Sequence, residues 1–168
     1  MGRVADHLTE PGRWVRRSHA TAHWLWARGH RTAAKVVALL CRFATGADVH
    51  PGALVGRGLM VCHGMGLVIG EGARLGDGCQ VLQGVTIGSR GGAGMPSIGN
   101  DVLIGANAVL LGAIAVGDGA QIGAGAVVLQ DVPARWTAVG NPARLLPPKG
   151  ERSALKGRQP FLEARDGG

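Results

Sequence analysis

The chain has 168 residues, of which 46% are hydrophobic, enough for one folded domain with a short appendage. Thirty glycines with only 4% aromatic residues and no tyrosine are unusual for a helical or sandwich protein, and the glycines lack the Gly-X-Y period of collagen. The net charge of +7 comes mainly from residues 1–46, where eight Lys/Arg face two Asp/Glu.

Basic segments can bind nucleic acid or lipid, but no RNA-binding or DNA-binding signature accompanies this one. We therefore expect neither a nucleic acid partner nor a membrane, but a solvated helix face or a weak attraction for a phosphate-bearing cofactor. The three cysteines, Cys41, Cys62 and Cys79, form no CxxC pair and are odd in number, which argues against a disulfide framework or a structural zinc site. No apolar run is long enough to span a bilayer, and we expect a cytoplasmic protein.

Residues 1–46 are predicted to form a helical cap. Between Trp14 and about Phe43 the pattern predicts two helices broken near Gly29, and Gly46 is placed to end the second. Because the first coil of a repeat structure needs covering, we expect these helices to pack against it. Their candidate apolar residues are Trp24, Leu25, Val36, Val37, Leu39 and Leu40.

Residues 47–146 contain a six-residue repeat. An aliphatic residue recurs every six positions, in three registers separated by two insertions. The thirteen positions are Val49, Val55, Val61, then Ile69, Leu75, Val81, Ile87, then Ile98, Ile104, Leu110, Val116, Ile122 and Val128.

Small residues accompany this aliphatic row. Glycine follows it at eight of the thirteen positions, and a small residue often stands four positions on, as at Ala53, Ala73, Cys79, Ala108, Ala120 and Ala126. Such hexads predict a parallel β-helix, in which each hexad gives one short strand and one corner and three hexads give a triangular coil. An antiparallel sheet with alternating faces would require a period of two.

Two insertions interrupt the repeat. The step from Val61 to Ile69 is two residues too long, and the step from Ile87 to Ile98 is five too long. The extra residues must leave the coil as loops, and loops on a rigid scaffold often carry function. Beyond the repeat, residues 147–168 are polar with several Pro and Gly, which predicts a flexible tail.

The first insertion contains His63, the best candidate for a catalytic base. A histidine in a glycine-flanked loop is accessible, and its pKa lies near the working pH. Asp48 stands fifteen residues earlier, close to the eighteen of a full coil, so stacking brings the two residues near each other. An Asp–His pair is one interpretation; in the other, Asp48 caps a turn and His63 is a plain loop residue.

At these residues the sequence resembles the serine acetyltransferases of the hexapeptide-repeat acyltransferase superfamily. The resemblance runs from about Arg16 to Leu146, and its most specific strings are VHPGA, HGMGLVIGE and QGVTIG. It implies an all-β left-handed parallel β-helix of triangular coils with a short N-terminal α-helical cap. It also implies an enzyme that moves an acetyl group from acetyl-CoA to a hydroxyl, with His63 as general base and Asp48 orienting it.

The resemblance further implies how acetyl-CoA, the co-substrate, is held. CoA lies along the coils between two protomers of a homotrimer, and no metal takes part. Positions matching Ala106 and Ala124 offer backbone groups, the loop near Ser89 and Arg90 lies beside the cofactor, and Arg90 or Arg144 is suited to a phosphate.

The chain departs from the family at the acceptor. Members carry an aspartate before the base, where this chain has Cys62, and Arg-His before the proline of the second loop, where it has Gly94 and Met95. Those positions hold the charged groups of free serine, so we expect O-acetyl transfer to a small-molecule hydroxyl other than free serine in the usual pose, such as a sugar or a carrier-linked amino acid.

Several alternatives stay open. One is a genuine serine O-acetyltransferase of cysteine biosynthesis, and another is a non-catalytic CoA-binding scaffold. A zinc-dependent β-helix like the γ-carbonic anhydrases needs three converging histidines, whereas this repeat holds His50 and His63. A covalent acyl intermediate on Cys62 is a further mechanism.

Overall fold

The computed structural model describes residues 11–92 and 94–148, and most of the predicted C-terminal tail lies outside these ranges. Two helices come first, α2 (Pro11–Ala27) and α3 (Arg31–Thr45), separated by Gly29. Gly46 ends α3 in the left-handed conformation with φ 73°, and its N–H donates to the carbonyl of Arg42. The two helices, the break and the glycine stop are confirmed as predicted.

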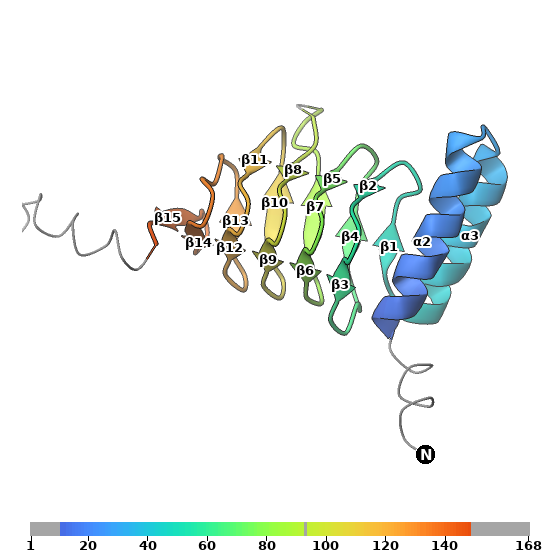
Figure 1. The fold of residues 1–168 in the computed structure, drawn as a ribbon, viewed down its shortest axis with the longest axis horizontal. Helices are drawn as coiled ribbons and strands as arrows, with labels where there is room; N and C mark the ends of the chain where they lie inside the picture. The colour runs from blue at the N-terminus through green and yellow to red at the C-terminus, as the bar shows by residue number, and fades with distance from the viewer. Residues whose placement is uncertain (1–10, 93, 149–168) are drawn as a thin grey trace, which may run out of the picture.

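A parallel β-helix follows the helices (Figure 1). Its short strands stack into three parallel sheets, one along each side of the coil, and the last strand alone is antiparallel. Sheet A holds β1 (Asp48–Val49), β4 (Val68–Ile69), β7 (Thr86–Gly88), β10 (Val109–Leu111) and β13 (Val127–Val128). Sheet B holds β2 (Leu54–Val55), β5 (Arg74–Leu75), β8 (Ser97–Ile98) and β11 (Ala115–Val116). Sheet C holds β3 (Met60–Val61), β6 (Gln80–Val81), β9 (Leu103–Ile104), β12 (Gln121–Ile122), β14 (Thr137–Val139) and β15 (Arg144–Leu146).

The core is the aliphatic row of the repeat. Each of the thirteen hexad residues lies on its own strand, and all except the half-buried Val55 are buried. The small residues four positions later, such as Ala73 and Ala108, are fully buried beside them. The hexad therefore predicts both the strands and the inward side chains, because the same two positions of every hexad point into a coil of three flat sides.

The glycines that follow the aliphatic row have a role other than a positive φ. A Cβ added to Gly76 would lie 2.6 Å from the carbonyl oxygen of Gly99, and one on Gly105 would lie 2.6 Å from the nitrogen of Ala124. In both cases the obstacle is the backbone of the next coil. These glycines are therefore required because adjacent coils approach too closely for a side chain.

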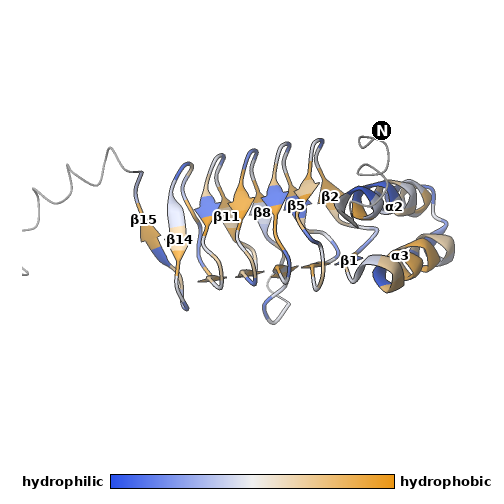
Figure 2. Cartoon of the chain, turned by 90° about the horizontal axis from the view of Figure 1, so that it is seen from below, coloured by the Kyte–Doolittle hydropathy of each residue, from blue (hydrophilic) through white to orange (hydrophobic). Residues whose placement is uncertain are grey.

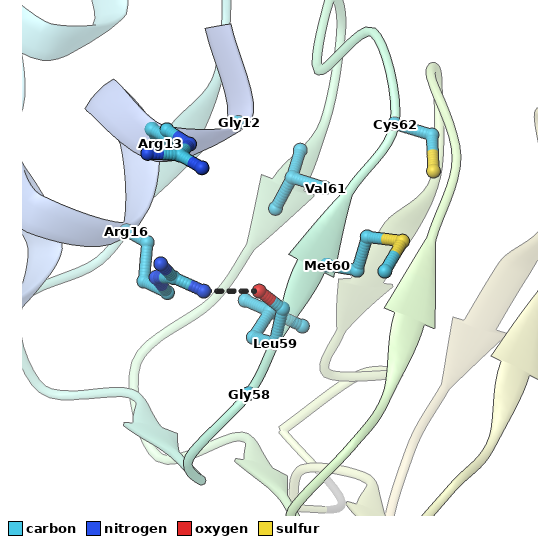
Figure 3. Close-up of a pocket in the computed structure, with 8 residues that line it drawn as sticks. All are labelled: Gly12, Arg13, Arg16, Gly58, Leu59, Met60, Val61 and Cys62. Atoms are coloured by element: carbon cyan, nitrogen blue, oxygen red, sulfur yellow. Dashed lines mark hydrogen bonds between the residues drawn. The ribbon is translucent and has the colours of Figure 1, made fainter. Parts of the chain in front are cut away.

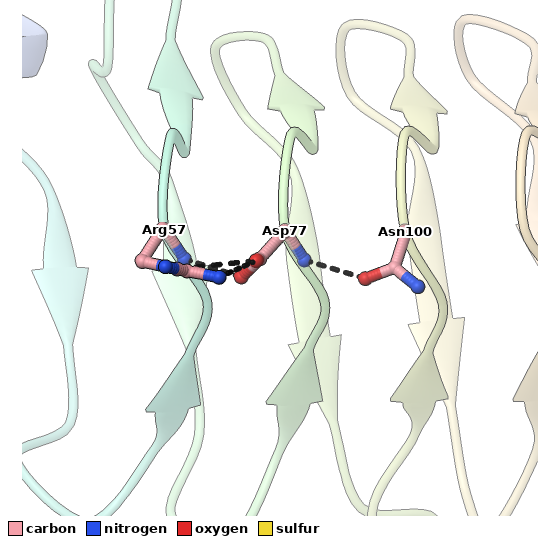
Figure 4. Close-up of polar contacts among 3 residues, drawn as sticks. All are labelled: Arg57, Asp77 and Asn100. Atoms are coloured by element: carbon pink, nitrogen blue, oxygen red, sulfur yellow. Dashed lines mark hydrogen bonds and ion pairs between the residues drawn. The ribbon is translucent and has the colours of Figure 1, made fainter.

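A polar ladder runs along the corner between sheets B and C (Figure 4). The carboxylate of Asp77 accepts the backbone N–H of Arg57 at 2.7 Å, and Asn100 Oδ1 accepts the N–H of Asp77 at 2.8 Å. Asp118 continues the ladder by accepting the N–H of Asn100. The N–H and guanidinium of Arg57 lower the pKa of Asp77. Each side chain thus satisfies a corner N–H of the preceding coil.

Both ends of the coil are covered. Helix α2 crosses the first coil from Gly12, next to Val61, to His23, whose Nδ1–H donates to the carbonyl of Pro51 at 2.8 Å. At the other end Val132 pairs with β11, β14 pairs with β12, and the N–H of Ala143 donates to the carbonyl of β13 residue Val127. The reversed strand β15 then pairs with β14.

Helix α3 presents an apolar stripe to solvent (Figure 2). Val36, Leu39, Leu40 and Phe43 recur at helical spacing, and Phe43 is 82% exposed. Of the helices in the described ranges, none combines the length and the apolar character needed to cross a membrane.

The contact between α2 and the coil contains a buried histidine. His19 is 8% exposed, and burial, aided by the neighbouring His23, lowers its pKa to about 4. The folded state therefore holds His19 neutral while the unfolded chain protonates it below pH 6.5. Above pH 6.5 the histidine is neutral in both states and does not affect the free energy of unfolding. Between pH 6.5 and about 4 only the unfolded chain binds the proton, so the free energy of unfolding decreases.

We expect acid to destabilise the fold through His19 by about 2 kcal/mol at pH 5. Thermal unfolding measured between pH 7.5 and 5 should show the loss in the wild type and a smaller loss in His19→Gln. His30→Gln, a change at an exposed histidine, is the control and should keep the wild-type pH dependence. Identical curves for wild type and His19→Gln would contradict the assignment.

Candidate active site

The first insertion forms a tight turn between β3 and β4 that exposes His63. The turn is closed by the N–H of Gly64 donating to the carbonyl of Cys62 and the N–H of Met65 donating to that of His63, both at 2.9 Å. His63 has φ 65°, in the left-handed region that favours glycine. A non-glycine residue held in this conformation is strained, and such strain often occurs at functional sites.

Asp48, the predicted partner of His63, lies in the neighbouring coil without bonding to it. Within the chain its carboxylate pairs with Arg42, Nη1 to Oδ2 3.2 Å. Strand pairing places Asp48 opposite Val68, five residues past His63. The two extra residues of the insertion make this first coil twenty residues long, so the fifteen-residue spacing from Asp48 to His63 falls five residues short of a full coil.

The turn of His63 begins a column of turns along the corner between sheets C and A. Backbone bonds link Gly84 to Met65, Asn107 to Gln83, and Gly125 to Ala106, each at 2.8–2.9 Å. Ala106 and Ala124, the residues predicted to bind CoA, thus lie in the same column as His63. With roughly 4.8 Å between strands, they lie about 10 and 14 Å from its coil along the axis.

The second insertion projects from the opposite edge of sheet A, between β7 and β8 (Figure 1). Ser89 and Arg90 stand exposed at its base, and Gly94 is exposed while Met95 packs against the coil. Arg144 lies exposed on β15, in the last part of the coil. A single chain therefore does not bring the predicted CoA residues to one corner: Ala106 and Ala124 lie at one edge of sheet A, and Ser89 and Arg90 at the other.

Gln83 is a candidate that the sequence reasoning missed. It lies on the corner column one coil beyond Met65, and its Oε1 is buried without a hydrogen-bond partner. A buried side-chain oxygen without a partner is costly, which singles out Gln83 among the residues of the column. The available signal was its place as the only side-chain amide of the QGVTIG string.

The other histidine of the repeat, His50, contacts helix α2 of the N-terminal cap. Its ring packs edge-on to Trp26 at 5.0 Å, its Nδ1 accepts the N–H of Gly52, and its Nε2 lies 3.8 Å from Glu71. Within residues 11–92 and 94–148, no three His, Cys, Asp or Glu side chains gather closely enough to hold a metal ion.

Known proteins share this coil. Residues 95–130 match the family model described as bacterial transferase hexapeptide (six repeats). The serine acetyltransferase of Helicobacter pylori is 46% identical over 142 residues, which cover 83% of each chain. That of Mycobacterium tuberculosis is 42% identical over 131 residues, covering 76% of this chain and 57% of its own. The crystal structure of serine acetyltransferase in complex with coenzyme A from Brucella abortus superposes with a TM-score of 0.81 at 38% identity, covering 83% of this chain and 57% of that one.

The fold and the hexad define a hexapeptide-repeat protein with a left-handed parallel β-helix. Within that class, the chain belongs to the serine acetyltransferase family. It spans about three fifths of the length of the first curated relatives, 57% and 61%. The expectation that the acceptor is a hydroxyl other than serine finds no support among these relatives, which favour the serine alternative.

Proposed function

We propose that this chain transfers the acetyl group of acetyl-CoA to the hydroxyl of serine. His63 takes the hydroxyl proton while the serine oxygen attacks the thioester carbonyl carbon. The tetrahedral intermediate collapses, the carbon–sulfur bond breaks, and the CoA sulfur receives the proton from the imidazolium. The products are O-acetylserine and CoA, and the reaction needs no further reactant.

The observation that carries the proposal is the position of His63. It is exposed, it is held in a strained turn, and it begins the corner column that continues through Ala106 and Ala124. A pantetheine arm that follows this column over small side chains would bring its thioester to the imidazole. In this proposal Asp48 turns from Arg42 to the imidazole when the site is assembled and fixes its tautomer.

We further propose that the active site lies between protomers of a homotrimer. The column of His63 and the loop of Ser89 and Arg90 stand at opposite edges of sheet A, which supports two CoA sites, each built from the column of one chain and the loop of another. A neighbouring copy would bring its loop to the column of the first, and Arg90 or Arg144 would meet the CoA phosphates.

The acceptor is tested by following CoA thiol release from acetyl-CoA with serine, homoserine, sugars and carrier-linked serine. The proposal expects release with serine and the mass of O-acetylserine in the product. Release only with a sugar or a carrier-linked acceptor would contradict serine while retaining the acetyl transfer. The absence of release with every acceptor, together with CoA binding, would favour the scaffold alternative.

We expect CoA to stabilise the fold, because a ligand that binds only the folded state raises its stability by about 2.7 kcal/mol at a hundredfold excess over Kd. Thermal shift assays with CoA should show the rise in wild type and a smaller one in Arg90→Gln. Arg74→Gln, a change on the outer face of β5, serves as the matched control. An equal shift in all three proteins would remove Arg90 from the CoA site.

A further inference from the structure

Helix α2 is tied to the first coil by two side chains that lie seven residues apart. Arg16 Nη1 donates to the carbonyl of Leu59 at 3.4 Å (Figure 3), and His23 Nδ1–H donates to the carbonyl of Pro51 at 2.8 Å. The helix and the coil segment beneath it therefore run in opposite directions. Towards the start of the helix a cavity of about 380 Å³ lies beside Cys62, and further along a larger groove of about 810 Å³ lies between α2 and β2.

The larger groove presents accessible apolar surface. Leu54, Val55 and Leu75 line it from the coil, and Trp24 lines it from α2. Leu54 is 43% exposed and Trp24 is 52% exposed, so two large apolar side chains stand open to a ligand. A volume of about 810 Å³ lies within the range of small-molecule sites and is far larger than an inorganic ion needs.

The same groove carries positive charge. Arg16 and Arg28 line it from α2 and Arg57 lines it from the coil, and none of its thirteen described lining residues is acidic. Asp77, which lies outside the lining, pairs with Arg57 at 3.2 Å. Arg16 bonds to a neutral carbonyl and Arg28 stacks over the ring of Trp24 at 3.9 Å, so neither pairs with a carboxylate in the described part of the chain.

His19 lies between the two attachment points, three residues after Arg16 and four before His23, and it lines the groove. Its ring is 92% buried and neutral at pH 7, because burial lowers its pKa to about 4. Its Nδ1 is buried without a hydrogen-bond partner. An orphaned buried N–H is rarer in proteins than an orphaned acceptor, so the ring proton belongs on Nε2. Nε2–H is then the donor that His19 offers to a ligand.

We propose that this groove binds a small organic oxyanion, a carboxylate or a phosphate monoester joined to an apolar body. The anionic group lies between Arg16 and His19, which are one helical turn apart, and receives a charge-assisted bond from the guanidinium and a bond from Nε2–H. The apolar body covers Leu54 and Trp24. A cation is excluded because three arginines surround the groove.

The groove is separate from the proposed active site within the chain. It lies at the corner between sheets B and C, where Arg57 stands, whereas the turn of His63 stands at the corner between sheets C and A. The inference therefore goes beyond the proposed acetyl transfer and does not depend on it.

The test is calorimetric titration of the full chain, without CoA, with four probes. Phenyl phosphate and benzoate carry both an anionic group and an apolar body, and the tighter of the two identifies the anion. Benzamide lacks the charge and inorganic phosphate lacks the apolar body, so each should bind at least about 10-fold more weakly, the usual effect of losing a charge-assisted hydrogen bond or a buried ring.

Two variants locate the probe in the groove. Arg16→Gln and His19→Phe, which keeps a ring in place, should each weaken binding of the tighter probe about 10-fold. Arg17→Gln, at an exposed neighbour on α2 outside the groove, should match wild type. Thermal unfolding of each variant verifies that the fold is kept, and Arg16→Gln carries the test if His19→Phe unfolds.

Three results would overturn the proposal. Benzamide binding as tightly as benzoate would show that charge plays no part, and wild-type affinity in Arg16→Gln would place the probe elsewhere. A loss of binding in Arg90→Gln would assign the probe to the proposed CoA site instead of the groove. The acetyl transfer is judged independently by CoA release, so either proposal can fail while the other stands.

Discussion

His63→Asn should lower acetyl transfer by about 10²- to 10⁴-fold, the usual contribution of a general base. Asparagine lacks a basic ring nitrogen but tolerates the left-handed backbone of this turn, where φ is 65°. The side chain is exposed, so its loss removes no core packing. The measurement is CoA release at saturating acetyl-CoA, with thermal unfolding recorded on the same samples.

His30→Asn provides the matched control for this change. His30 precedes α3, is exposed and lies far along the chain from the insertion. It should keep wild-type turnover and melting temperature. Unchanged turnover in His63→Asn would remove His63 from the mechanism, whereas a lower melting temperature would show that the turn itself depends on the ring.

Gly105→Ala should destabilise the coil by about 1–3 kcal/mol, the usual cost of overpacking. The new Cβ would lie 2.6 Å from the nitrogen of Ala124, and a backbone atom in the next coil cannot move aside as a side chain can. In a domain of this size each kcal/mol lowers Tm by roughly 2–4 °C, which thermal or denaturant unfolding resolves.

Gly88→Ala tests whether the destabilisation comes from the close contact between coils or from the loss of any glycine at this hexad position. Gly88 occupies the same hexad position after Ile87, but the nearest atom to an added Cβ is Leu111 Cδ2 at 3.5 Å, an ordinary contact. This variant should unfold close to wild type. Equal destabilisation by both substitutions would contradict the close approach of coils as the reason for the glycines.

The coil was predictable because its period is dictated by burial. Only the aliphatic residue and the residue four positions later point into the three-sided coil in each hexad, so an aliphatic row such as Ile98 to Val128 predicts strands and core together. The two lengthened steps predicted where chain would leave the coil. The helix stop at Gly46 was equally local, since a left-handed cap favours glycine.

The site was less predictable because it depends on packing between distant segments. The cavity beside Cys62 exists only because α2 docks on β3, with Gly12 against Val61, and no spacing in the sequence encodes that contact. The spacing of fifteen residues between Asp48 and His63 was compared with a coil of eighteen, but the insertion lengthens this coil to twenty residues. The close approach of coils at Gly76 and Gly105 likewise depends on stacking, so the sequence gives no direct sign of it.

The covered end of the coil has a consequence for assembly. A stack of parallel strands is a template for further strands, and an open last rung would invite another molecule to add end to end, as in a fibril. Here Val132, β14 and the N–H of Ala143 occupy the three sides, and β15 then reverses direction. The last coil therefore presents no open set of three parallel strands that a further copy could extend.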